Sequence, residues 1–188
     1  MKFTFVFILM AASVSAQDAV PTAIPQSACG PMDVKFQIKQ EGSQSANPKV
    51  EEGKALVFVI EGEQFKAAKE VTVRVGVDGA WVGATRGNSY LFFTVEPGEH
   101  HLCANIMPGV LSPSRPVSFY GLTAEAGSVY YFRARTTGGP SSAMYRNGLD
   151  DIISIDLDRL NNDEGKYLVA YSPLSVSNAR AVKAEGKK

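Results

Sequence analysis

The chain has 188 residues and carries 19 basic and 19 acidic side chains, so its formal net charge at pH 7 is zero. A near-neutral chain without a basic patch offers nucleic acid little electrostatic attraction, and it gives no reason to expect steering toward anionic membrane surfaces. The length suits one domain with a substantial core and irregular ends.

The first 16 residues have the features of a secretory signal peptide. Lys2 precedes an apolar run over residues 3–10, and small residues end this segment at Ala16. The run is too short for a membrane anchor, which needs roughly 20 apolar residues. We expect cleavage before Gln17, which leaves a formal charge of −1, and no lipid anchor because residue 17 is not cysteine. No later segment is apolar enough to span a bilayer, so the sequence predicts export to the periplasm or the extracellular space.

The next part of the chain predicts a leader and then strands. Residues 17–28 are rich in Ala, Pro, Gln and Ser, which is typical of a flexible leader, and residues 34–39 alternate apolar and polar side chains as in a strand. After a loop over residues 41–53, the continuous apolar run at 55–60 predicts a strand buried on both faces. Valines at every second position of residues 71–77 predict a half-buried strand.

Two turns are predicted with a physical reason for each. Asp78-Gly79 between apolar segments indicates a hairpin, because both turn residues must accept positive φ. In residues 96–99, proline followed by glycine favours a type II turn. This turn joins a strand at 89–95 to a strand over 100–106.

The remaining elements complete an all-β pattern. We expect strands over residues 117–125, 128–136 and 152–157, with a loop over 136–144. Asn161 followed three residues later by Glu164 indicates the start of a short helix. The sequence therefore predicts an Ig-like or prealbumin-like antiparallel β-sandwich of about seven or eight strands, or a strongly curved barrel-like version of it, with one short C-terminal helix. The predicted domains are a signal peptide (1–16), a leader with one possible strand (17–50), the sandwich (51–175) and a disordered basic tail (176–188).

Residues 53–135 resemble a bacterial family known only as domain of unknown function 2846. The resemblance rests on the apolar run after Gly53-Lys54, the Val77-Asp78-Gly79 turn, the Gly87-Asn88-Ser89-Tyr90 segment, Pro97-Gly98-x-His100, and Ala126-Gly127-x-x-Tyr130-Tyr131-Phe132. The Val-Asp-Gly and Pro-Gly-x-His features are also loosely similar to PEGA-type surface-layer modules. The resemblance implies export in a bacterium and a sandwich fold, and it brings no catalytic residues.

Cys29 and Cys103 are the only cysteines, so one intramolecular pairing is available in an oxidising compartment. We expect them to form a disulfide that ties the leader to a core strand. The alternative is two unpaired thiols, one of them buried.

Metal-ligating residue types gather at residues 96–103, and this cluster supports a rival hypothesis of a metal-binding or hydrolytic protein that uses His100, His101 and Cys103. On a regular strand His101 and Cys103 share one face while His100 lies on the other, and no fourth ligand is evident. No Gly-x-Ser-x-Gly elbow occurs. The acidic residues 156–165 do not fit a calcium loop, because Leu160 stands where an oxygen ligand is needed and Asn161 stands where glycine should make the turn. We therefore expect no metal, no cofactor and no enzymatic activity.

Trp81 is the candidate binding residue, because it follows the Asp78-Gly79 turn closely and should lie near a loop rim. Packing within the sandwich is the alternative for Trp81 and for the other strand aromatics. The sequence thus favours an exported, non-enzymatic binding or cell-envelope accessory module with a protein or glycan partner, and with no nucleic-acid ligand.

Overall fold

The computed structural model describes residues 29–42, 48–62, 71–107, 116–140 and 150–181. The predicted signal peptide, the leader over residues 17–28 and the last residues of the predicted tail (182–188) lie outside these ranges. Within them, no helix has both the length and the apolar character that a membrane span requires.

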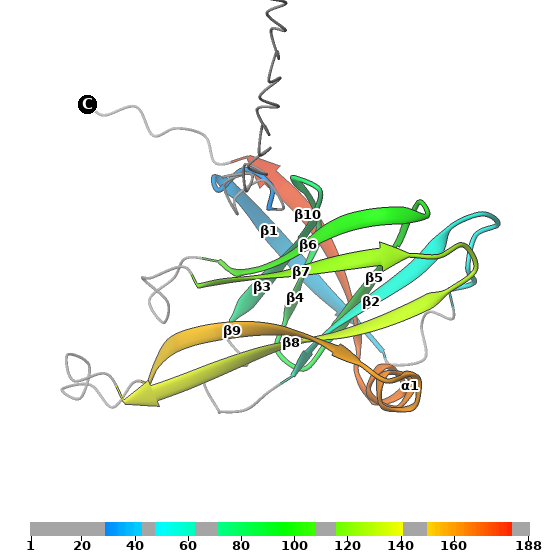
Figure 1. Cartoon of the computed structure of the whole chain (residues 1–188). Coiled ribbons are helices and arrows are strands. Elements are labelled where there is room, and N and C mark those ends of the chain that lie inside the picture. Colours follow the sequence, from blue (N-terminus) through cyan, green and yellow to red (C-terminus); the bar gives the residue numbers. More distant parts are fainter. Residues whose placement is uncertain (1–28, 43–47, 63–70, 108–115, 141–149, 182–188) are drawn as a thin grey trace, which may run out of the picture.

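Two stacked sheets form the molecule (Figure 1). The six-stranded sheet contains, in spatial order, β1 (Val34–Glu41), β10 (Leu174–Ala181), β5 (Tyr90–Val95), β2 (Ala55–Gly62), β8 (Val129–Pro140) and β9 (Asp150–Leu160). The four-stranded sheet contains β4 (Ala80–Arg86), β3 (Thr72–Val77), β6 (Gly98–Ile106) and β7 (Val117–Ala124). The helix α1 (Asn162–Tyr171) lies beside the larger sheet. The all-β sandwich with one short helix is confirmed.

The topology differs from the prediction in two respects. Ten strands are described instead of seven or eight, and two of the strand pairs are parallel, β2 with β8 and β10 with β5. The chain leaves the larger sheet after β5, forms β6 and β7 in the smaller sheet, and returns as β8 beside β2. Such a crossover between sheets brings neighbouring strands into parallel alignment.

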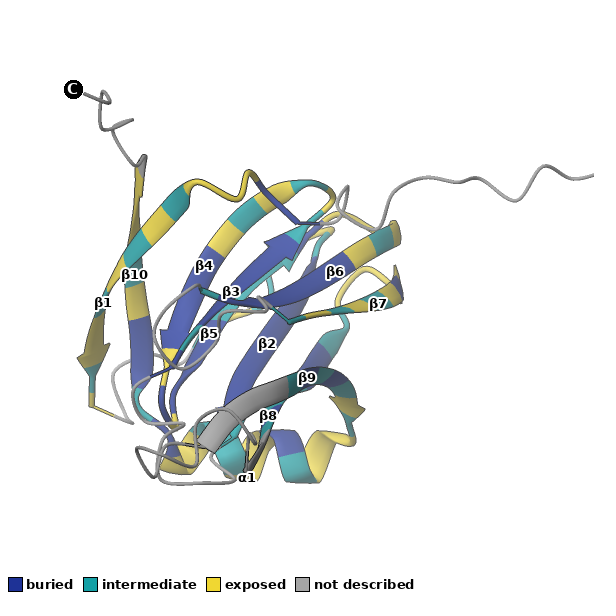
Figure 2. Cartoon of the chain, turned by 90° about the vertical axis from the view of Figure 1, so that its left-hand side faces the viewer, coloured by how far each residue is buried: buried dark blue, intermediate teal, exposed yellow. Residues whose placement is uncertain are grey.

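The core has two layers, and β2 contributes to both of them. Val57 and Val59 point into the cluster between the sheets, while Leu56, Phe58 and Ile60 belong to a second cluster on the opposite face. Leu168 and Val169 of α1 pack against this second cluster. The prediction of a strand buried on both faces is confirmed, and Figure 2 shows β2 buried along its length.

The predicted hairpin turn and helix start agree with the backbone geometry. Asp78 and Gly79 have φ values of 49° and 86°, as the hairpin requires. Gly98 has a positive φ as predicted, but its value of 134° lies far from the roughly 80° of a type II turn, and Gly98 is already the first residue of β6. At the start of α1, the backbone N–H of Glu164 donates to Oδ1 of Asn161 at 2.9 Å, so the predicted N-cap is confirmed.

Two segments predicted to be irregular are strands. Strand β10 runs to Ala181 and pairs with β1 over its full length, so the prediction of a disordered tail was wrong for residues 176–181. The small residues of β10 carry a weak strand signal, and its pairing partner is at the far end of the chain. Similarly, β8 continues through Pro140 in its ladder with β9, so the prediction of a loop was wrong for residues 136–140, and residues 141–144 of that predicted loop lie outside the described ranges.

Candidate functional site

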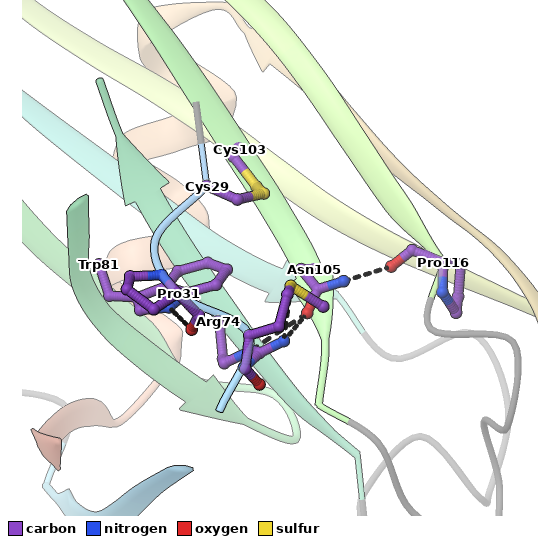
Figure 3. The surroundings of a disulfide bond; sticks show 8 residues. Cys29, Pro31, Arg74, Trp81, Cys103, Asn105 and Pro116 are labelled. Atoms are coloured by element: carbon purple, nitrogen blue, oxygen red, sulfur yellow. Dashed lines mark hydrogen bonds between the residues drawn. A yellow bond between two sulfur atoms is a disulfide. The ribbon is translucent and has the colours of Figure 1, made fainter. Parts of the chain in front are cut away.

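The N-terminal segment 29–34, which we call the strap, lies against the outer face of the four-stranded sheet (Figure 3). The strand registers place two rows of side chains across this face. The first row is Trp81, Gly76, Cys103 and Phe119, and the second is Ala84, Arg74, Asn105 and Val117. The outer face of a sandwich sheet is commonly polar and solvated. Here the strap covers part of a face that contains many apolar groups.

A disulfide fixes one end of the strap. Cys29 and Cys103 are bonded with their Cα atoms 5.3 Å apart, and both residues are buried. The predicted pairing is therefore confirmed. Because the sulfur of Cys103 is committed to this bond, it supplies no thiolate for a nucleophile or for a metal ligand.

The indole of Trp81 anchors the middle of the strap. Its Nε1–H donates to the carbonyl oxygen of Pro31 at 2.7 Å, and its ring lies so close to Gly30 that a Cβ at position 30 would overlap it. The ring is half-buried, and it packs within the molecule against the Cys29–Cys103 disulfide. A role for Trp81 in binding a partner stays a prediction.

Arg74 is fully buried beneath the strap and holds its backbone. One guanidinium nitrogen, Nη1, donates to the carbonyl oxygens of Val34 at 2.9 Å and Met32 at 3.2 Å. Nε and Nη2 donate to Oδ1 of Asn105, and the guanidinium carbon lies 4.5 Å from the centroid of the Trp81 ring. These carbonyl acceptors and the aromatic face offset the cost of removing the charge from water.

Sequence reasoning missed Arg74. In the alternating valine pattern of β3 it occupies a position that predicts exposure, because the face opposite the core normally meets solvent. The strap, a segment about forty residues earlier in the chain, covers it together with the ring of Trp81. The nearest signal in the sequence is Cys103 on the neighbouring strand, since its disulfide partner had to cross the same face.

The two histidines gather at a different place, around the carboxylate of Asp78. His100 Nδ1 lies 2.6 Å from Asp78 Oδ2, and its Nε2 lies 2.7 Å from the carbonyl oxygen of Glu96. The backbone N–H of His101 donates to Asp78 Oδ1 at 2.8 Å, and its largely exposed ring has Nδ1 at 4.0 Å from the same oxygen. The strand alternation holds, but a carboxylate in the β3–β4 turn contacts both histidines.

The geometry indicates a charged, structural histidine. Both ring nitrogens of His100 face acceptors, and only the imidazolium form can donate from both. Desolvation by partial burial is the largest single influence on the pKa of His100 and opposes the charge. The hydrogen bonds to the Asp78 carboxylate and the Glu96 carbonyl, together with the attraction of both carboxylates, outweigh it and raise this pKa above its ordinary value. For Asp78, desolvation is likewise outweighed by the hydrogen bonds from His100 and the His101 backbone, and its pKa is lowered. In this state His100 has no free lone pair with which to act as a general base or as a metal ligand.

The metal hypothesis finds no cluster to support it in the part of the chain that the structure describes, where no group of three or more His, Cys, Asp or Glu side chains could hold an ion.

Large apolar side chains remain exposed beside the strap. Met32 on the strap is 38% exposed, and Phe119 and Val117 on β7 are 39% and 41% exposed. Phe119 is the register partner of Cys103, and Val117 is that of Asn105, so both flank the anchored residues. We call Met32, Val117 and Phe119 the apolar patch.

Comparisons with known proteins identify a family for this chain. Neither the curated proteins nor the solved structures contain a match. A family model described as "Protein of unknown function (DUF2846)" matches residues 51–149, which is just over half of the 188 residues. This range contains the hairpin turns, Trp81, the histidines and Cys103. The chain therefore belongs to the DUF2846 family.

Proposed function

We propose that this protein is an exported, non-enzymatic binding module of the bacterial cell envelope, and that it holds a protein partner on the apolar patch. The observation that carries the proposal is the exposure of Met32, Val117 and Phe119 together on one face, next to a strap that is fixed by a disulfide. Clusters of exposed apolar side chains rimmed by polar groups are typical of interaction sites, whereas single exposed residues are ordinary.

The anchoring of the strap favours binding. Its backbone is held at Cys29 by the disulfide, at Pro31 by Trp81, and at Met32 and Val34 by Arg74. A surface that is already ordered loses less conformational entropy on association than a loose loop does. Phe119 is exposed on a strand of the sheet, and an aromatic side chain that becomes buried on association can dominate the binding energy of an interface.

The residues proposed for catalysis support the binding interpretation more than the enzymatic one. Cys103 is bonded to Cys29, and both nitrogens of His100 contact acceptors. His101 has a largely exposed ring with one carboxylate at 4.0 Å. Nucleophilic hydrolysis requires a nucleophile within hydrogen-bond distance of a base. These three residues do not form such a pair.

A pull-down from envelope extract with three forms of the protein tests the proposal. The wild type is compared with the double variant Val117→Ser, Phe119→Ser and with a control, Tyr171→Ser, which removes an aromatic ring that is 72% exposed on α1. We expect a stoichiometric protein partner with the wild type and the control, and its loss with the double variant. Equal recovery by all three forms, or no partner with any of them, would contradict the proposal.

Export is tested separately by fractionating cells and sequencing the N-terminus of the recovered protein. A mature chain that starts at Gln17 and is found outside the cytoplasm is the expected result. An intact N-terminus on cytoplasmic protein would remove the envelope part of the proposal.

A further inference from the structure

A second surface with the properties of a ligand site lies where the six-stranded sheet and α1 meet the end of β7. Val117 of the apolar patch lies at the opposite end of this strand. The second surface is a cleft with a volume of about 410 Å³. The cleft lies between the β7–β8 turn, β8, the end of β9 and the start of α1, and its lining residues are Glu125, Ser128, Val129, Tyr130, Tyr131, Arg159, Asn162 and Lys166. Small-molecule sites commonly measure about 300–1,000 Å³.

The floor of this cleft is held in place by hydrogen bonds and packing. The hydroxyl of Tyr130 accepts from the backbone N–H of Glu125 at 3.0 Å and donates to the carbonyl oxygen of Thr123 at 3.3 Å. On the helix side, Gly165 lets α1 approach the ring of Tyr131, since a Cβ at position 165 would overlap that ring. The cleft is therefore formed before any ligand arrives, which limits the entropic cost of binding.

Two basic side chains at this cleft form no salt bridge within the described ranges, whereas two nearby arginines on β8 do. Arg133 pairs with Glu164, and Arg135 lies 3.0 Å from Asp158. In contrast, Arg159 and Lys166 have no carboxylate within 4.0 Å in the described ranges of the chain. The guanidinium carbon of Arg159 lies 5.0 Å from the centroid of the Tyr130 ring, and this contact orients it without neutralising it.

We propose that this cleft binds an acidic sugar, with the sugar carboxylate against Arg159 and Lys166 and the hydroxyls against Ser128, Asn162 and Glu125. A guanidinium suits a planar carboxylate because it can donate two parallel hydrogen bonds. Hydroxyl groups can both donate and accept, so they match a lining that mixes a carboxylate, an amide and a hydroxyl. Glu125 disfavours a phosphate, since a second negative charge on the ligand would be repelled by it.

The N-terminus of α1 contributes little to the preference for a negatively charged sugar. Asp163 and Glu164 lie in the first turn of α1 and compensate the positive end of its dipole. The preference for a charged sugar therefore depends on Arg159 and Lys166, which makes it testable by single substitutions.

NMR titration of the purified protein with D-galacturonate, D-galactose and acetate tests the proposal. We expect saturable shifts of the backbone amides of Ser128, Asn162 and Lys166 with galacturonate, and binding at least tenfold weaker with galactose, which lacks the carboxylate, and with acetate, which lacks the hydroxyls. Arg159→Gln should weaken galacturonate binding about tenfold and Lys166→Gln several-fold. The control Arg180→Gln, an exposed arginine on β10, should leave it unchanged.

Three results would overturn the proposal. Equal binding of galacturonate and galactose would show that the cations do not select the ligand. Equal binding of acetate would show that the hydroxyl contacts are absent. Equal weakening by Arg180→Gln would show non-specific attraction to the overall charge. None of these results depends on whether the apolar patch binds a protein.

Discussion

Removal of the Cys29–Cys103 disulfide should lower the free energy of unfolding substantially. The perturbation is the double substitution of both cysteines by alanine, which avoids placing a hydroxyl in the fully buried site of Cys103. The bond joins positions 74 residues apart. The loop-closure relation gives an entropic stabilisation of about 4.4 kcal/mol for a loop of that length, and measured values for disulfides are typically about 2–4 kcal/mol. We expect a loss of about 3 kcal/mol.

Urea denaturation provides the assay, followed both by far-UV circular dichroism and by the fluorescence of Trp81, the single tryptophan. With an m-value of about 2 kcal/mol/M, the loss corresponds to a midpoint about 1.5 M lower. The indole contacts the strap directly through Gly30 and Pro31, so its emission reports whether the strap stays in place. Wild-type protein in the presence of a reductant should reproduce the midpoint of the double variant.

The two probes also separate the anchors of the strap. Arg74 and Trp81 still bind the strap backbone when the disulfide is absent, so in the folded variant the fluorescence should remain close to that of the wild type. A loss below about 1 kcal/mol, or a reductant that leaves the wild-type midpoint unchanged, would refute the reasoning. Either result would mean that the bond restricts the unfolded chain far less than its loop length implies.

Three other substitutions have directions that follow from single contacts. Arg74→Met should cost about 3 kcal/mol in urea denaturation, because the strap carbonyls and an asparagine amide oxygen lose their donor in a buried place; a neutral effect would mean that water replaces the guanidinium. Gly165→Ala should lower the melting temperature despite the higher helix propensity of alanine, because the added Cβ overlaps the Tyr131 ring, at a cost of about 1–3 kcal/mol; a stabilised variant would contradict this packing. His100→Gln should remove about 0.5–1 kcal/mol, since the Asp78 carboxylate is nearly half exposed. The raised pKa of His100 contributes stability below its ordinary value of 6.5, and the lowered pKa of Asp78 contributes stability above 3.8. The difference in free energy of unfolding between wild type and His100→Gln should therefore be largest between these two pH values. It should shrink as the pH rises through the folded pKa of His100, and also as the pH falls through the folded pKa of Asp78. A pH-independent difference would contradict the ion pair.

Local chemistry made several elements predictable from the sequence. The Asp78-Gly79 turn depends on backbone conformations that these two residues accept, and the helix start depends on a hydrogen bond between Asn161 and a residue three positions away. The continuous apolar run of β2 predicts burial on both faces without knowledge of what covers it. In each case the cause and its effect lie within a few residues.

The features that sequence reasoning missed have causes that are distant along the chain. Strand β10 is composed of small and polar residues, and it forms because its backbone pairs with β1, where Val34 lies opposite Ala181. Arg74 is buried because the strap crosses its face, and both histidines contact the Asp78 carboxylate although it lies more than twenty residues earlier in the chain. Pairings of this range are fixed by topology, which a periodicity pattern within one strand does not contain.

The boundary of the family match indicates why the strap is important to this chain. Residues 51–149 include all of β2 to β8, but β1, β9, β10 and α1 lie outside them. Those outer elements supply three strands of the larger sheet and the helix that covers its outer face, so the matched region alone would leave the cluster around Leu56 and Phe58 open to water. Within the matched region, Cys103, Trp81 and Arg74 all direct their contacts to the strap, which precedes it. Since the strap continues directly into β1, these contacts attach the edge of one sheet to the face of the other. The apolar patch lies at this junction, where a partner would meet a surface composed of both the matched region and the strap that precedes it.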